Sequence, residues 1–407
     1  MPAHTRTAAT TTALLLTALL TTTATTTAGA APAPAARPAT PADCTTTLWA
    51  PNTGGNAAYR IPAVVSVRGT LVAFAEARKH SASDNGDISI VERRSTDGGC
   101  TWSAQTTAAD DWYDAVGNPT PLVADDGTLV LVFCRQGGTV TQDDIQAGTV
   151  SAADARRVFV QTSDDAGATW SARREITAQV KRAGWRWYAT GPGHGVTIQH
   201  GAAMGRLVIA ADHTLSTRDQ RGIQTLISDD DGATWRLGAV DDHSADDDPI
   251  RPDETTAAEL LDGRMYFSSR NVDGASQDPP LGRAYTYSTS SGSTFTAPAR
   301  PMPALTVPEV EGSLLQDHGL PAGVSCAPLL FSAPEDPSVR QNLTVRRSDD
   351  GGITWRTIAQ ITGPDVHAAY SDVVKTDRTH LGVAYETWGT TGSPASIAWT
   401  TVLVGCP

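Results

Sequence analysis

Ser95-Thr-Asp97-Gly-Gly-Cys-Thr101-Trp102 is the first of four copies of one short pattern. In each copy Asp and Gly favour a tight turn, the Ser and Thr hydroxyls can bind its backbone, and the Trp can pack the turn onto the next strand. The other intact copies are Ser163-Asp-Asp165-Ala-Gly-Ala-Thr169-Trp170, Ser228-Asp-Asp230-Asp-Gly-Ala-Thr234-Trp235 and Ser348-Asp-Asp350-Gly-Gly-Ile-Thr354-Trp355.

A degenerate fifth copy, Ser290-Ser-Gly292-Ser-Thr294-Phe295, lacks the acidic residue. The five copies recur at intervals of 58 to 68 residues, which indicates a repeat architecture. The pattern resembles the Asp box, a turn of β-propellers in sialidases and several other carbohydrate-active proteins. Residues 43–407 also alternate strand patterns with turn signals. We therefore expect an all-β fold, a six-bladed β-propeller of four-stranded antiparallel blades with Asp-box turns, forming one catalytic domain over residues 43–407.

Residues 1–42 have the composition of a secretory signal peptide followed by a Thr/Ala/Pro-rich spacer. A weakly basic start leads into a short apolar run at 13–20, and Ala28-Gly-Ala30 offers a cleavage site. The alternative is a disordered cytosolic tail. The apolar run is too short to span a membrane, and no later stretch is long enough. The sequence thus predicts a secreted, extracellular protein with no membrane span.

Charge and metal-ligand patterns narrow the possible partners. A net charge of −13 argues against nucleic-acid binding. The nine histidines are scattered, without H-E-x-x-H or C-x-x-C spacing, so we expect no metal and no cofactor. We also expect a monomer.

Strand direction predicts which residues share one end of the propeller. In the first unit, residues 61–67, 70–75 and 88–93 read as successive strands, and the Asp box then turns into a fourth. If strand one starts at the top, the Asp boxes lie at the bottom, and ligand sites lie where the top loops converge. Seven reactive side chains fall at top positions: Arg60, Asp84, Glu254, Arg270, Arg340, Tyr370 and Glu386.

This set suits one kind of ligand. Clustered like charges cost free energy unless a ligand compensates them, so packing alone would not select three such arginines. Converging guanidinium groups suit a carboxylate. A sugar with a carboxylate on its anomeric carbon would repel a carboxylate nucleophile, whereas a tyrosine hydroxyl deprotonated by a glutamate avoids that repulsion.

Over essentially all of residues 43–407 the chain resembles a secreted bacterial sialidase, an exo-α-neuraminidase. The matching motifs are the four boxes, Tyr59-Arg60-Ile61-Pro62, Phe74-Ala-Glu-Ala-Arg78, Pro252-Asp-Glu254 and Ser269-Arg270-Asn271. The family often has Asn where this chain has Asp253.

By position, the resemblance implies a role for each site residue. Arg60, Arg270 and Arg340 would bind the substrate carboxylate, and Glu386 would orient Arg60. Tyr370 would be the nucleophile and Glu254 its general base. Asp84 would be the acid/base, and Arg78 would steady the substrate or the Asp84 loop.

The activity so implied is retaining hydrolysis of terminal α-linked sialic acids from glycoproteins, glycolipids and oligosaccharides through a tyrosyl-enzyme intermediate. Two alternatives stay open. The same residues would serve a trans-sialidase, and Asp boxes also occur in non-catalytic glycan-binding propellers. A purely glycan-binding protein would not need Tyr370 and Asp84 together.

Rival residues exist for several positions. Asp87 borders the same loop as Asp84, and Glu259 lies in the same motif as Glu254. The positions of Arg346 and Arg347 near a box, and of Arg264 after a bottom turn, predict surface charges away from the site. The Asp-box residues themselves are expected to be structural.

Strand counting predicts how the ring closes. The last unit offers only three strands, at 370–374, 381–386 and 397–404, and the one strand-like segment before the first unit is 44–49. That segment should become the outer strand of the last blade and remove an open sheet edge. The arrangement predicts a Cys44–Cys406 disulfide, with Cys100 as the main rival partner for Cys44 and Cys134 as a poor one.

Overall fold

Strands joined by tight turns make up most of the chain. The computed structural model describes residues 44–216, 220–243, 249–277, 280–318, 327–388 and 396–404. In these residues the strands form five hydrogen-bonded sheets. Two short helices, α1 (Gln142–Ala147) and α2 (Thr177–Val180), lie between strands. None of the helices in this part of the chain is both long and apolar enough to cross a membrane.

The largest sheet has eight strands and divides at one point. A single parallel pair, Ile88 with Ala115, joins two groups of four strands that are otherwise antiparallel. The first group is β2 (Ala58–Val67), β3 (Thr70–Arg78), β4 (Ile88–Ser95) and β5 (Thr106–Ala109). The second group is β6 (Ala115–Val123), β7 (Leu129–Gln136), β8 (Arg157–Ser163) and β9 (Arg174–Glu175).

The next three sheets follow one another along the chain, and their strands pair antiparallel. One holds β10 (Tyr188–Thr190), β11 (Val196–Thr197), β12 (Leu207–Thr214), β13 (Arg221–Ser228) and β14 (Arg236–His243). Another holds β15 (Pro252–Glu259), β16 (Met265–Asn271), β17 (Arg283–Ser288) and β18 (Arg300–Met302). The third holds β19 (Ser313–Gln316), β20 (Leu329–Pro334), β21 (Leu343–Ser348) and β22 (Arg356–Gln360).

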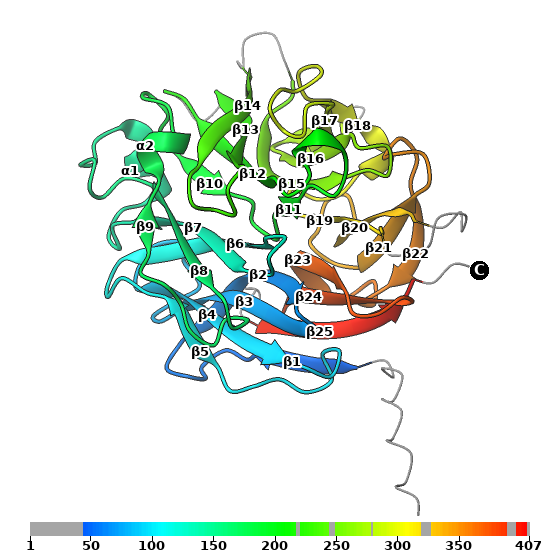
Figure 1. Cartoon of the computed structure of the whole chain (residues 1–407), viewed down its shortest axis with the longest axis horizontal. Helices are drawn as coiled ribbons and strands as arrows, with labels where there is room; N and C mark the ends of the chain where they lie inside the picture. The colour runs from blue at the N-terminus through cyan, green and yellow to red at the C-terminus, as the bar shows by residue number, and fades with distance from the viewer. Residues whose placement is uncertain are drawn as a thin grey trace, which may run out of the picture. The chain divides into compact units, whose positions relative to one another are not determined.

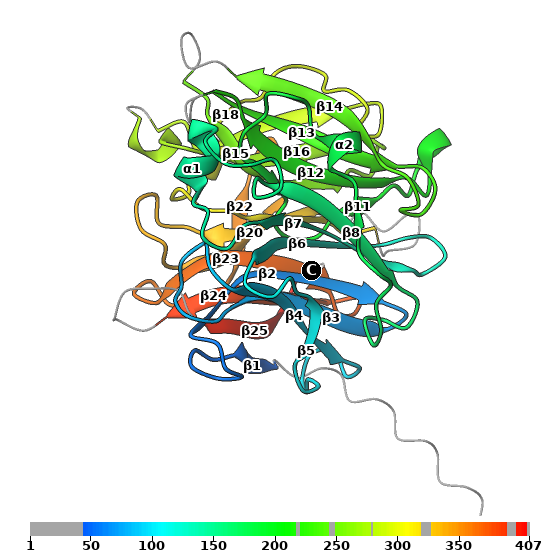
Figure 2. The same ribbon diagram turned by 90° about the vertical axis from the view of Figure 1, so that its left-hand side faces the viewer.

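The last sheet joins the two ends of the described chain. It holds β23 (His367–Lys375), β24 (His380–Trp388), β25 (Ser396–Leu403) and β1 (Thr45–Trp49), in the order β1-β25-β24-β23. β1 lies beside β25 in both views (Figures 1 and 2), with Thr45 opposite Thr400. The predicted closure by an N-terminal outer strand is therefore confirmed.

The first strand of each unit lies innermost. β2 contacts β6 and β23, β6 contacts β10, β10 contacts β15, β15 contacts β19, and β19 contacts β23 (Figure 1). Hydrophobic clusters fill the spaces between neighbouring sheets, such as the one that joins Trp49, Tyr59 and Trp399. The described chain is thus an all-β propeller with four-stranded antiparallel sheets, and its inner strands converge on one axis.

Each Asp box stabilises its turn through side-chain hydrogen bonds to the backbone. In the four intact copies the Asp carboxylate accepts the N–H of the Thr four residues later at 2.7–2.9 Å and the hydroxyl of that Thr at 2.6–2.7 Å. In the degenerate copy the Ser290 hydroxyl accepts the Thr294 N–H at 2.9 Å, and the Ser288 hydroxyl accepts the Gly292 N–H at 3.0 Å. That repeat therefore begins at Ser288, and Ser290 stands where the other copies have Asp.

The predicted Cys44–Cys406 disulfide is wrong, because Cys44 is bonded to Cys100. Cys44 lies at the start of β1, and its Cα is 5.0 Å from that of Cys100 in the first Asp box. Trp102 of that box packs against Trp399 of β25 with ring centroids 5.1 Å apart, which brings the box beside β1. Cys406 and the predicted signal peptide and spacer lie outside the described residues, and Cys134 is a buried free thiol.

Candidate active site

Four inner strands are irregular at the same end of the propeller. The register of pairing shifts between Arg60 and Ala63 in β2, and between Gly117 and Thr120 in β6. It shifts likewise at residues 252–255 in β15 and at residues 368–371 in β23. A β-bulge re-aims the side chains beside it, and bulges are common next to active sites. Here they turn Arg60, Glu254 and Tyr370 toward one cavity.

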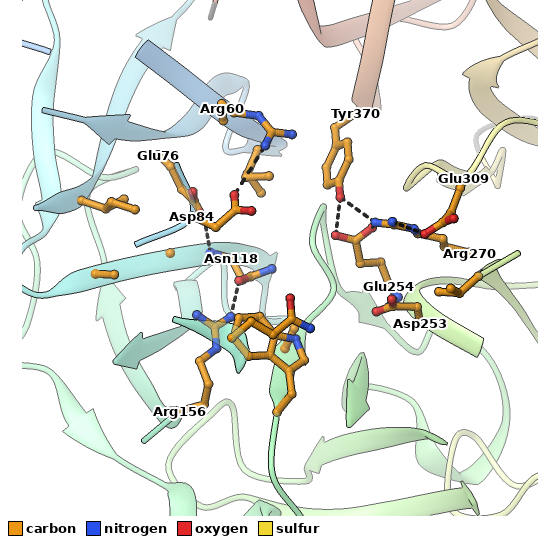
Figure 3. Close-up of a pocket in the computed structure, with 18 of the residues that line it drawn as sticks. Arg60, Glu76, Asp84, Asn118, Arg156, Asp253, Glu254, Arg270, Glu309 and Tyr370 are labelled. Carbon is orange, nitrogen blue, oxygen red and sulfur yellow. Dashed lines mark hydrogen bonds and ion pairs between the residues drawn. The ribbon is translucent and has the colours of Figure 1, made fainter. Parts of the chain in front are cut away.

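Tyr370 and Glu254 are joined by a short hydrogen bond in this cavity. The Tyr370 hydroxyl donates to Glu254 Oε1 at 2.5 Å, and Arg270 Nη1 donates to Glu254 Oε2 at 3.0 Å and to the tyrosine oxygen at 3.1 Å (Figure 3). Burial, followed by the charge of Glu254, raises the pKa of Tyr370 well above its ordinary value. Burial also raises the pKa of Glu254, against the opposing effect of Arg270. Ionisation of the tyrosine therefore needs an adjacent base.

Arg60 is fixed from behind by Glu386. Its Nε and Nη2 donate to the two Glu386 carboxylate oxygens at 3.0 and 3.2 Å, and the Ile61 N–H donates to the same group at 2.9 Å. The Glu386 side chain is fully buried, so this bidentate pair holds the guanidinium rigidly. The Arg60 guanidinium lies 5.3 Å from the centre of the Tyr370 ring.

Arg270 and Arg340 also lie close to Tyr370, and both contact Glu309. The Arg340 guanidinium lies 5.6 Å from the Tyr370 ring centre, and its Nη2 donates to the Glu309 carbonyl at 2.8 Å. Arg270 Nη2 donates to the Glu309 carboxylate at 2.6 Å. Arg340 lies three residues before β21.

Asp84 lies across the cavity from Tyr370 (Figure 3), on the loop between β3 and β4. Its side chain is 75% exposed and accepts from Arg78 Nη1 at 2.7 Å, with Arg60 Nη1 at 3.5 Å. Desolvation by the cavity walls opposes ionisation, but the charges of Arg78 and then Arg60 lower the pKa of Asp84 below its ordinary value. Arg78 is itself held by Glu76 through bonds of 3.0 and 2.6 Å.

The cavity has a volume of about 470 Å³ and is lined by all the predicted site residues except Glu386, which lies behind Arg60. Several other residues that line the cavity were not predicted from the sequence: Glu76, Asn118, Arg156, Trp187, Arg221 and Glu309. The strand-direction argument that placed the other site residues at the top could also have found Glu309, because Glu309 shortly precedes the innermost strand of its sheet. Glu76 gave no such signal, because it approaches the cavity only where Gly117 leaves room for it.

The rival residues lie elsewhere. Asp87 pairs with Lys79 at 2.9 Å outside the cavity. Glu259 is buried at the other end of β15 and accepts the Gln199 and His200 N–H groups at 2.6 and 3.1 Å. Arg264, near Asp262, is at a turn, as expected. Arg346 and Arg347 also lie away from the cavity, but they are buried at 6% and 9% exposure, so the prediction of surface charges was wrong for both.

The described segments contain no evident metal-binding site. No group of three or more His, Cys, Asp or Glu side chains there is placed to hold a metal ion. The positive charge that faces the cavity comes from arginines.

A tyrosine–glutamate pair, an aspartate and three arginines around one cavity of a β-propeller are the arrangement expected from the resemblance to sialidases. Residues 69–383 match the family model described as a BNR repeat-like domain, and the chain belongs to this family. This match, together with the sialidases described next, confirms the resemblance inferred from the sequence.

Named sialidases are among the relatives. A sialidase of Micromonospora viridifaciens is 29% identical over 344 residues, which cover 81% of this chain and 50% of the relative. An exo-alpha-sialidase of Aspergillus fumigatus is 34% identical over 209 residues, covering 44% of this chain and 50% of the relative. The solved structure of the Hadza microbial sialidase Hz136 matches with a TM-score of 0.72 and 26% identity, covering 86% of this chain and 66% of that one. The chain spans about half the length of the first two relatives.

Proposed function

We propose that this chain is a retaining exo-α-sialidase that hydrolyses terminal α-linked sialic acids from glycoconjugates. The observation that carries the proposal is the 2.5 Å contact between Tyr370 and Glu254, set among three arginines. The relatives named as sialidases support it. A carboxylate-bearing sugar fits a cavity in which every cation is a guanidinium able to bind a planar anion in a fork.

In the proposed first step the substrate carboxylate binds Arg60, Arg270 and Arg340. The Tyr370 oxygen attacks the anomeric carbon while its proton passes to Glu254, and the bond from that carbon to the leaving oxygen breaks. Asp84 supplies the proton that the leaving oxygen takes up. The products are a tyrosyl-linked sugar and the free remainder of the glycan.

In the second step water attacks the same carbon on the side that the leaving group vacated. Asp84, now ionised, takes a proton from this water, and the tyrosine oxygen leaves and regains its proton from Glu254. Two displacements at one carbon retain its configuration.

We further infer six blades, since each group of four strands in the eight-stranded sheet can be counted as one blade. A signal peptide over residues 1–42, secretion, one catalytic domain over residues 43–407 and a monomeric state remain proposals from the sequence.

A chromogenic sialoside tests the proposal. We expect the wild-type protein to release the chromophore, and Tyr370→Phe, which removes one hydroxyl, to lose several powers of ten in kcat. A product analysis with and without lactose distinguishes hydrolysis from transfer. Sialyl-lactose as the main product would contradict hydrolysis, and no release by the folded wild-type protein would contradict the sialidase proposal itself.

A further inference from the structure

Two neighbouring aromatic side chains stand in solvent beside the active site. Trp112 is 80% exposed and Tyr113 is 75% exposed, in the loop between β5 and β6. The chain has ten tryptophans, and Trp112 is the one in the described residues that is largely exposed. Exposed apolar surface costs free energy in a soluble protein, and a concentrated patch commonly marks a binding site.

Ion pairs fix the loop that carries these rings. Arg135 and Arg173 bind Asp111 at 2.9 and 2.6 Å, Arg135 also binds Asp114, and the Gly138 N–H donates to Asp114 at 2.9 Å. Trp112 has a φ of +60°, which is unfavourable for a bulky residue. The backbone is therefore held firmly in a strained form that leaves both rings exposed, and such strain is concentrated at functional sites.

The two rings border a second cavity of about 410 Å³. Besides the aromatic faces, this cavity offers amide and charged groups that can bind hydroxyls as donors or acceptors. Besides Tyr113, its polar side chains are Asn56, Lys79, Asp87, Ser89, Gln105, Thr107 and Asp110.

One loop separates this cavity from the active site. The loop between β3 and β4 carries Asp84 into the active-site cavity and the Lys79–Asp87 pair into the second cavity. Ala115, two residues after Tyr113, already lines the active-site cavity. Two residues of extended chain reach about 7 Å, comparable with the width of one sugar ring.

We infer that the second cavity binds neutral sugar residues on the leaving side of the substrate glycan. This inference rests on the proposed function, in which Asp84 protonates the leaving oxygen, so that the rest of the glycan extends past the Asp84 loop. The C–H face of a pyranose packs on an aromatic ring, and its hydroxyls match the amides and carboxylates beside Trp112 and Tyr113. The protein thus prefers sialylated oligosaccharides over sialosides with a small leaving group.

Steady-state kinetics with two substrates tests this inference. We compare a sialylated pentasaccharide with 4-methylumbelliferyl sialoside for wild type, Trp112→Ala and Tyr113→Ala. The kcat/KM for the pentasaccharide divided by that for the 4-methylumbelliferyl sialoside should fall about five- to tenfold in each variant, mainly because KM for the oligosaccharide rises. The control Leu261→Ala removes another exposed apolar side chain, far from both cavities, and should leave the ratio unchanged.

Tryptophan fluorescence separates this inference from the proposed function. Titration with the desialylated oligosaccharide should change the emission of the wild type, and Trp112→Phe should abolish most of that change. An unchanged kinetic ratio in both alanine variants would overturn the inference while sialidase activity persists. A loss seen with sialoglycoproteins but not with oligosaccharides would also overturn it, because the contact would then be with protein. Failure of the wild type to cleave either substrate would instead overturn the proposed function.

Discussion

The Tyr370 hydroxyl and the Glu254 carboxylate meet at 2.5 Å although 116 residues separate them in the chain. One comes from β23 and the other from β15, and both strands are bulged at the contact. Burial raises the pKa of the tyrosine well above its ordinary value and also raises that of the glutamate. Glu254 is therefore a stronger base than an exposed glutamate, and it touches the proton that must move.

Replacing any one of Arg60, Arg270 and Arg340 by lysine should raise KM for sialosides at least tenfold. Lysine keeps the charge but cannot reproduce the planar fork that binds a carboxylate. Arg356→Lys, at a side chain that is 62% exposed, is the matched control and should behave as wild type. Equal effects at all four positions, measured by initial rates, would argue against a carboxylate site.

Removing the charge of Arg78 should shift the pH dependence of kcat/KM. Asp84 must be protonated to act as an acid, so activity falls as pH rises through its pKa, which Arg78 lowers. Without that charge the pKa of Asp84 rises, and the descending limb should move to higher pH.

The double variant Glu76→Gln/Arg78→Met is the one to measure, since it leaves no buried unpaired carboxylate behind. The single variant Glu76→Gln serves as its control. A descending limb that stays in place in the double variant, or moves to lower pH, would contradict the assignment of Asp84.

Glu309→Gln should tighten the binding of sialic acid or of a carboxylate analogue severalfold. The Glu309 carboxylate lies 2.6 Å from Arg270 Nη2 and so competes for the guanidinium that the ligand carboxylate needs. The amide removes the like charge and can still accept one hydrogen bond. Calorimetric titration measures the change, and weaker binding would show that Glu309 chiefly holds Arg270 in place.

Loss of the Cys44–Cys100 bond should destabilise the protein without altering the active site. The bond closes a sequence separation of 56 residues, for which chain entropy gives about 4 kcal/mol. It also anchors β1, the outer strand of the last sheet. Thermal unfolding of Cys44→Ser/Cys100→Ser should therefore show a lower Tm with near-normal kcat below the transition. An unchanged Tm, or a non-reduced peptide map that lacks the Cys44–Cys100 link, would contradict this.

The repeats and the alternation of strand direction allowed most of the site to be predicted from the sequence. The four boxes mark where strands turn, so alternating strand direction correctly grouped Arg60, Asp84, Glu254, Arg270, Arg340 and Tyr370 around one cavity. The same reasoning predicted that β1 pairs with the last sheet as its outer strand. Each of these inferences depends on order along the chain, which a repeat fixes.

Contacts between neighbouring units could not be predicted from the sequence. Cys44 faces the box of the first unit because Trp399 packs against Trp102, and this packing between sheets has no sequence period. Glu76 enters the site because Gly117, in the next unit, lacks a side chain. The burial of Arg346 and Arg347 was likewise not predicted, because a position near a box says nothing about how the side chains of that strand are packed.

Covalent trapping tests the central claim most directly. A sialyl donor that carries fluorine at C3 slows both displacements, because fluorine destabilises the oxocarbenium-like transition state, and a good leaving group at C2 lets the first step outrun the second. After incubation, the intact mass should rise by one fluorosialyl group, and peptide mapping should place it on Tyr370. Tyr370→Phe should remain unlabelled. A label on Glu254, Asp84 or any residue other than Tyr370, or turnover of the donor without any covalent adduct, would contradict the tyrosyl-enzyme mechanism.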